Sequence, residues 1–264
     1  MSDDPVASWA NPGNFHAVWM GLLIVAVVLA FALRRESARS ISDVYLPRLA
    51  WLRAGLWFCA CFFVGGLAGI PAELIHAELA PPSLADRPQW WVLTVLVCAQ
   101  GAFAYLWLWP RGTVTHGRPR RLVLGVLFGS TWGLAQATLM LSIFMICAKL
   151  LGSNAWAVLP TFLVIAMLTG VWHGNYWDKY VAPDHNVTET NLRKILLGHA
   201  PFLLLTLLQL GLFGNPLLFV FQHVAALVCS TLAMRFPAPW DPAVAQHRPE
   251  GRSRTELTAI GLLR

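Results

Sequence analysis

Seven long runs of apolar residues dominate this sequence of 264 residues. A helix that crosses about 30 Å of hydrocarbon needs about 20 apolar residues, and each run is close to that length. Asp, Glu, Lys and Arg make up only 12% of the chain, against about 25% in an average soluble domain. We therefore predict an all-α bundle of seven transmembrane helices. The predicted spans are residues 15–33, 49–70, 89–109, 121–148, 154–178, 191–213 and 216–234.

Basic residues are distributed unequally between the two sets of predicted loops. Arg34 and Arg35 directly follow the first apolar run, and no basic residue precedes it. If these arginines lie inside the cell, 17 of the 19 Lys and Arg residues fall on the cytoplasmic side, and only Arg87 and Lys149 fall outside. Because cytoplasmic loops carry the excess of Lys and Arg, we predict an N-terminus outside and a C-terminus in the cytoplasm. We expect a multi-pass protein of the cell (plasma) membrane.

The sequence shows no convincing internal repeat, so we expect one membrane domain at residues 1–236. Residues 237–264 are polar and rich in Pro and Arg at first, and we expect a disordered cytoplasmic tail there. The net charge of +6 does not indicate a nucleic-acid partner, because the basic residues stand at the ends of apolar runs rather than on one soluble face. The expected partners are the lipid bilayer and a hydrophobic small molecule, and association of the chain with its own copies stays open.

Small residues follow one face of the fourth predicted helix. Gly125, Gly129, Gly133 and Ala137 are spaced four residues apart. Such a stripe lets the backbone of another helix approach closely. We expect it to pack against a neighbouring helix.

Polar residues concentrate between the fifth and sixth predicted helices. Three His, two Asp, one Glu and three Asn fall within residues 173–199. Ionisable residues in or near a membrane are costly and tend to mark function, although His, Asp and Asn also serve as caps and turns in a polar loop. Neutral His and carboxylates could act as general acids and bases, or could bind a divalent metal. A haem held by His173 or His199 together with another His also stays open. The predicted catalytic residues are Asp178, His199, His173, His185 and Asp184.

Aromatic and amide side chains near this group are expected to hold the substrate. Trp177 and Tyr180 follow His173 by four and seven residues, so the three share one helix face. The predicted substrate-binding residues are Tyr176, Trp177, Tyr180, Asn175, Trp132 and Gln136. Gln136 and Gln100 lie near the middle of their predicted helices, where a glutamine pair would join helices or line a substrate cavity. Pro201 is expected to kink the sixth helix beside His199, because it lacks a backbone N–H.

The leading hypothesis is a membrane enzyme that acts on a hydrophobic lipid or isoprenoid (terpenoid) substrate at the cytoplasmic leaflet. Its chemistry would be acid–base catalysis, as in a cyclisation or an isomerisation, or metal-assisted catalysis. One alternative is a transporter of small solutes or ions, whose path would pass outer Glu73 and His76, the central glutamines and inner His199. The other is a structural or assembly subunit, with the small-residue stripe as its partner face.

Overall fold

The structure is a computed structural model that describes residues 13, 15–22, 24, 47–110, 121–176 and 193–233. At residues 47–54 and 169–176 it describes the backbone alone. Within these ranges every regular element is a helix and there is no strand, as predicted. The elements are α2 (Pro47–Leu67), α3 (Ile70–His76), α4 (Pro82–Ala85), α5 (Pro88–Ala102), η2 (Phe103–Leu108), α6 (Leu122–Leu151), α7 (Asn154–Tyr176), η6 (Ile195–His199), α9 (Ala200–Phe213) and α10 (Pro216–Ala233).

Four helices in the described ranges are long and apolar enough to cross a membrane. They are Pro88–Leu108, Leu122–Leu151, Ile195–Phe213 and Pro216–Ala233. A fifth candidate forms if α2 and α3 count as one broken span, since their axes bend by 73°. The bend falls at Gly69, whose φ of 74° favours glycine. The structure thus shows an all-helical protein with four to five candidate spans, and the first predicted span is described only at residues 15–22 and 24.

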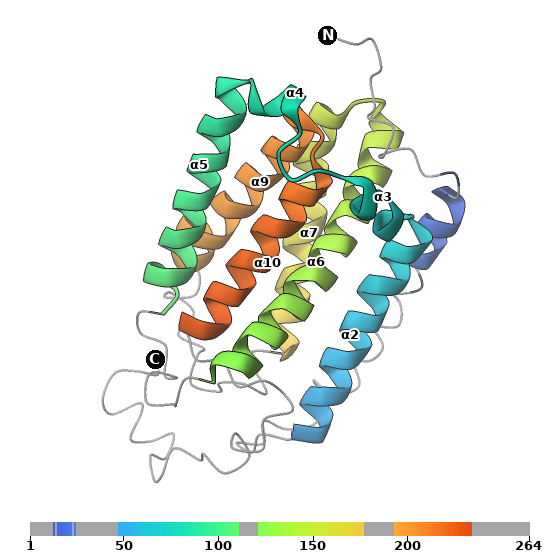
Figure 1. Ribbon diagram of the computed structural model, residues 1–264. Coiled ribbons are helices and arrows are strands. Elements are labelled where there is room, and N and C mark those ends of the chain that lie inside the picture. The colour runs from blue at the N-terminus through green and yellow to red at the C-terminus, as the bar shows by residue number, and fades with distance from the viewer. Residues whose placement is uncertain are drawn as a thin grey trace.

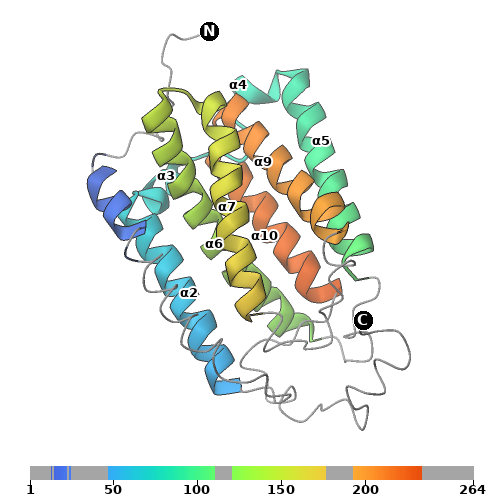
Figure 2. The same ribbon diagram turned by 180° about the vertical axis from the view of Figure 1, so that it is seen from behind.

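Helix α6 forms the centre of the bundle. It packs against α10, α7 and α2, and Figures 1 and 2 show α2 and α5 on opposite sides of this central group. Most of the apolar stretch of α6 is buried inside the protein, whereas most of the stretch through α5 and η2 is exposed. The outer helices therefore present apolar side chains where lipid would lie.

The small-residue stripe of α6 packs against α10, which confirms that another helix approaches it closely. A Cβ added at Gly133 would lie 2.6 Å from the Val224 Cα, and one at Gly129 would lie 2.7 Å from the Val228 Cα. Thr231 of α10 donates a hydrogen bond from its Oγ1 to the Gly125 carbonyl oxygen, at 2.8 Å. Because α10 of the same chain occupies this face, the stripe does not offer the partner surface of the assembly-subunit hypothesis.

Polar side chains also join the helices near the α9–α10 turn. Gln209 of α9 donates to the Thr94 Oγ1 of α5 at 2.6 Å, and its own Oε1 accepts from the Gln222 Nε2 of α10 at 2.7 Å. At the turn, the Asn215 Oδ1 accepts from the Leu218 N–H at 3.0 Å and so caps α10. These bonds fix α5, α9 and α10 relative to one another, and that arrangement holds the site described next.

Candidate functional site

Two π-helical segments, η2 and η6, lie against each other. A Cβ added at Gly198 of η6 would lie 3.3 Å from the Ala104 Cβ and 3.2 Å from the Leu108 Cδ2 of η2. This contact between η2 and η6 is called the π seam below. π-helical turns are rare and often occur at functional sites. The π seam is therefore a candidate functional site.

The hydrogen-bonding requirement of Pro201 explains why the helix departs from α geometry at η6. Pro201 has no N–H to donate to the carbonyl of Leu197, four residues earlier. The Gln100 Nε2 of α5 donates to this carbonyl oxygen at 2.8 Å, and to that of Gly198 at 3.1 Å. A neighbouring helix therefore satisfies the backbone groups that proline leaves, as membrane proteins require. Beside His199, where a kink was predicted, the helix contains a π-helical turn.

A hydrogen bond between Tyr105 and His199 crosses the π seam. The Tyr105 hydroxyl lies 2.6 Å from the His199 Nδ1, and the tautomer of the ring decides which group donates. Tyr105 is only 4% exposed. Its ring also packs edge-on against Phe202, with centroids 5.4 Å apart. A hydrogen bond thus joins a tyrosine and a histidine that belong to two different candidate spans.

His223 of α10 also packs against Phe202. Its ring centroid lies 5.4 Å from that of Phe202 and 4.2 Å from that of Phe219. The His223 Nδ1 donates to the Phe219 carbonyl oxygen at 2.9 Å, which leaves the Nε2 of the neutral ring as an acceptor. Among the described residues this buried Nε2 has no hydrogen-bond partner. Tyr105, His199, Phe202 and His223 are called the histidine cluster below.

A second contact closes the π seam at its other end. Lys194, only 5% exposed, donates from its Nζ to the Trp109 carbonyl oxygen at 3.0 Å. The ammonium lies 5.7 Å from the centroid of the Trp109 ring. A cation near the carboxyl end of a helix also interacts favourably with the helix dipole.

Most of the catalytic and aromatic residues predicted from the sequence fall where the structure gives no side-chain description. His173, Asn175 and Tyr176 belong to the end of α7, where only the backbone is described. Asp178, Asp184, His185, Trp177 and Tyr180 lie outside the described residues, as does the predicted tail at 237–264. Within the described ranges no three His, Cys, Asp or Glu side chains come together as metal ligands. The predicted polar group between the fifth and sixth helices stays a prediction.

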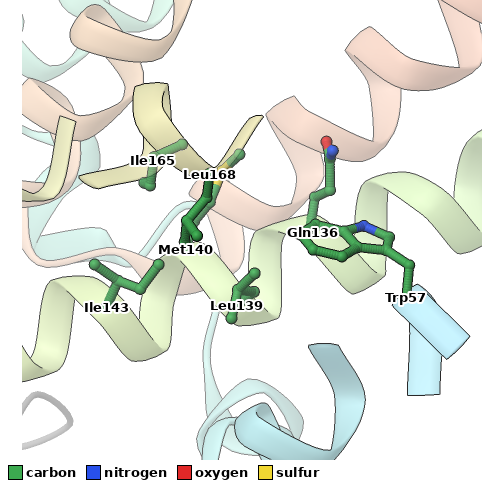
Figure 3. Close-up of a pocket in the computed structure, with 7 residues that line it drawn as sticks. All are labelled: Trp57, Gln136, Leu139, Met140, Ile143, Ile165 and Leu168. Carbon is green, nitrogen blue, oxygen red and sulfur yellow. The ribbon is translucent and has the colours of Figure 1, made fainter. Parts of the chain in front are cut away.

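Trp132 and Gln136 of α6 each lie beside another aromatic side chain. Trp132 is buried and packs against Phe128, with ring centroids 5.6 Å apart. Gln136 faces Trp57 of α2 in a pocket of about 10 Å³ (Figure 3), which is room for about one water molecule. The other lining residues are Leu139, Met140, Ile143, Ile165 and Leu168. In its present shape this pocket is too small for a lipid or isoprenoid.

The glutamine pair proposed from the sequence does not form. Gln100 bonds to η6 and Gln136 faces the pocket beside α2, so the two amides serve different helices. Tyr105, His223 and Lys194 were not among the site residues predicted from the sequence. His223 carried a usable signal, because it is an ionisable residue inside an apolar span.

Comparison of this chain with known protein families, with curated proteins and with solved structures gave no match. The function is therefore argued from the chemistry and geometry of the site alone.

Proposed function

We propose that this protein is an integral membrane enzyme that performs acid–base chemistry on a lipid or isoprenoid substrate at the cytoplasmic leaflet of the plasma membrane. In this proposal the chain crosses the membrane seven times, with its N-terminus outside and its C-terminus in the cytoplasm. The concentration of 17 of its 19 basic residues in alternate loops supports that orientation. The alternating directions of α5, α6, α7 and the α9–α10 pair are consistent with it (Figure 1).

The hydrogen bond between Tyr105 and His199 carries the proposal. In this mechanism the imidazole of His199 exchanges a proton with the substrate, and Tyr105 holds the ring and supplies or takes the proton at Nδ1. His223 adds a second basic nitrogen, because its Nδ1–H is committed to a backbone carbonyl and its Nε2 is an acceptor. Two such groups suit a cyclisation or an isomerisation, which adds a proton at one atom and removes one from another. A positioned acid–base group contributes about 10²- to 10⁴-fold to a rate.

The polar residues next to α7 complete the proposed site on its cytoplasmic side. Asp178, Asp184, His185 and His173 would add acid–base groups or bind a divalent metal ion. The neighbouring side chains of Asn175, Tyr176, Trp177 and Tyr180 would hold the apolar or cationic part of the substrate. The group begins in the last residues of α7 and continues into the chain before η6, which supports placing it near His199.

The test is a turnover assay on purified protein in proteoliposomes, with isoprenoid alcohols, isoprenoid phosphates and total membrane lipids as candidate substrates. Mass spectrometry follows substrate loss. We expect His199→Ala to reduce turnover by about 10²- to 10⁴-fold, and Tyr105→Phe and Asp178→Asn to reduce it less. His76→Ala is the matched control, because His76 is an exposed histidine on α3. Full activity in folded His199→Ala and Asp178→Asn would refute the site, and solute uptake without any turnover would favour a transporter.

A further inference from the structure

Lys194 is a buried cation without an acidic partner among the described residues. Its contacts there are the carbonyl oxygen and the ring of Trp109. A buried charge is costly unless another group compensates it. An ammonium has three N–H donors, and one of them is used. The Trp109 Nε1 is also buried and has no hydrogen-bond partner in the described part of the chain. Among the described residues, this end of the π seam therefore offers donors and positive charge without a matching acceptor.

Lys194 lies directly along the π seam from His199. The two residues are five apart in the chain, which is about one turn of a π-helix. Both bond to η2 or its end, Lys194 to Trp109 and His199 to Tyr105. In the proposed orientation Lys194 is on the cytoplasmic side of His199.

The outer surface beside the π seam is apolar. Three exposed apolar side chains come from each π-helical segment: Phe103, Leu106 and Trp107 of η2, and Ile195, Leu196 and Leu197 of η6. A ligand with one anionic end and one apolar chain fits this arrangement of charge and hydrophobic surface. A lysine that only reached toward lipid headgroups at the interface would keep its ammonium exposed, whereas Lys194 is buried.

We propose that Lys194 binds the phosphate group of an amphipathic substrate whose apolar chain lies against the outer surface of η2 and η6. Phosphate supplies several acceptors for the remaining ammonium N–H groups and the Trp109 indole N–H. Binding at Lys194 places the chain of the substrate next to His199. The inference rests on the proposed function for the identity of the ligand as a substrate, but the binding itself is measurable without turnover.

Equilibrium binding to the full chain in dodecyl maltoside tests this inference, with farnesyl phosphate, farnesol and inorganic phosphate as probes. We expect the wild-type protein to bind farnesyl phosphate at least tenfold more tightly than either farnesol or inorganic phosphate. Lys194→Met is expected to remove the preference for farnesyl phosphate over farnesol. Lys149→Met, which changes an exposed lysine near the carboxyl end of α6, is the matched control and is expected to keep that preference.

A measurement on the wild-type chain keeps the inference testable if Lys194→Met does not fold. Farnesyl phosphate should slow the acetylation of Lys194 at least threefold, as measured by peptide mass spectrometry, and should leave Lys149 unaffected. Equal affinity for farnesyl phosphate and farnesol, unchanged binding in folded Lys194→Met, or no protection of Lys194 would overturn the inference.

The binding and turnover results separate the two proposals. Lys194-dependent binding of farnesyl phosphate by a protein that turns over no candidate substrate would uphold the phosphate site and refute the enzyme. Turnover that depends on His199, together with farnesyl phosphate binding that does not depend on Lys194, would uphold the enzyme and refute the phosphate site.

Discussion

The close contact between α6 and α10 predicts how much the substitution Gly133→Ala destabilises the protein. At Gly133 the new Cβ would meet backbone atoms, 2.6 Å from the Val224 Cα and 3.0 Å from the His223 carbonyl oxygen. Backbone cannot rotate away, so the two helices must separate. Overpacking of this kind costs about 1–3 kcal/mol, and alanine regains about 0.5–1 kcal/mol of helix propensity. We expect Gly133→Ala to lower the free energy of unfolding by about 1 kcal/mol, the difference between the middles of these two ranges.

Two other glycines of the chain supply graded controls for this substitution. At Gly125 the added Cβ would lie 2.8 Å from the Leu232 Cδ2, the end of a flexible side chain that can rotate away. We therefore expect Gly125→Ala to change stability by less than about 0.5 kcal/mol. At Gly66 of α2 nothing lies within 4 Å of the added atom, so Gly66→Ala should stabilise the protein by about 0.5–1 kcal/mol.

The assay is unfolding by sodium dodecyl sulfate in mixed micelles, followed by circular dichroism. The predicted order of stability is Gly66→Ala first, then wild type and Gly125→Ala within about 0.5 kcal/mol of each other, and Gly133→Ala last. Because the Gly133 contact involves the carbonyl of His223, Gly133→Ala should also disturb the histidine cluster. If Gly133→Ala is as stable as wild type while Gly66→Ala behaves as expected, the close approach of α6 and α10 is wrong.

Two further predictions use the same unfolding assay. Asn215→Ala should cost about 1–2 kcal/mol, because it removes the cap of α10 and the bonds from the Asn215 Nδ2 to the carbonyl oxygens of Glu78 and Leu79. Asn215→Ser should recover the capping part, and no recovery would contradict the capping role. Gln100→Leu should cost about 1–3 kcal/mol, because it leaves the carbonyls of Leu197 and Gly198 without the amide donor. Gln89→Leu, at an exposed position of α5, is its control, and equal stability of the two variants would show that Gln100 does not support η6.

Hydropathy predicted the ends of several helices well. The run at 121–148 corresponds to α6 at Leu122–Leu151, and the run at 216–234 corresponds to α10 at Pro216–Ala233. These ends are predictable because the length of an apolar run is a local property of the sequence. The break between α2 and α3 was not predicted, because Gly69 stands among apolar residues and its positive φ leaves no mark in hydropathy.

The site was less predictable than the helices, because its contacts join distant parts of the chain. Tyr105 and His199 are 94 residues apart, and nothing in the sequence around either one indicates the other. His199 itself was predicted from its charge and its place near the interface. Gln100 was predicted to join helices, and it does so. Its partner is not Gln136 but the carbonyl oxygen of Leu197, which Pro201 cannot bond. The spacing of apolar residues did not predict η2 or η6, because one π-helical turn changes that spacing only slightly.

The facing π-helical segments also determine how these helices respond to the loss of one residue. Removing one residue from Ile195–His199 would let the chain return to the i→i+4 bonding of an ordinary α-helix. The helix would survive, and the residues before and after the deletion would keep nearly the same relative orientation, because four α-helical steps of about 100° come to about 400°, close to the one turn that five π-helical steps make. Lys194 and His199 would then still face η2 together. A length difference of one residue at η2 or η6 among related chains would therefore be compatible with this bundle.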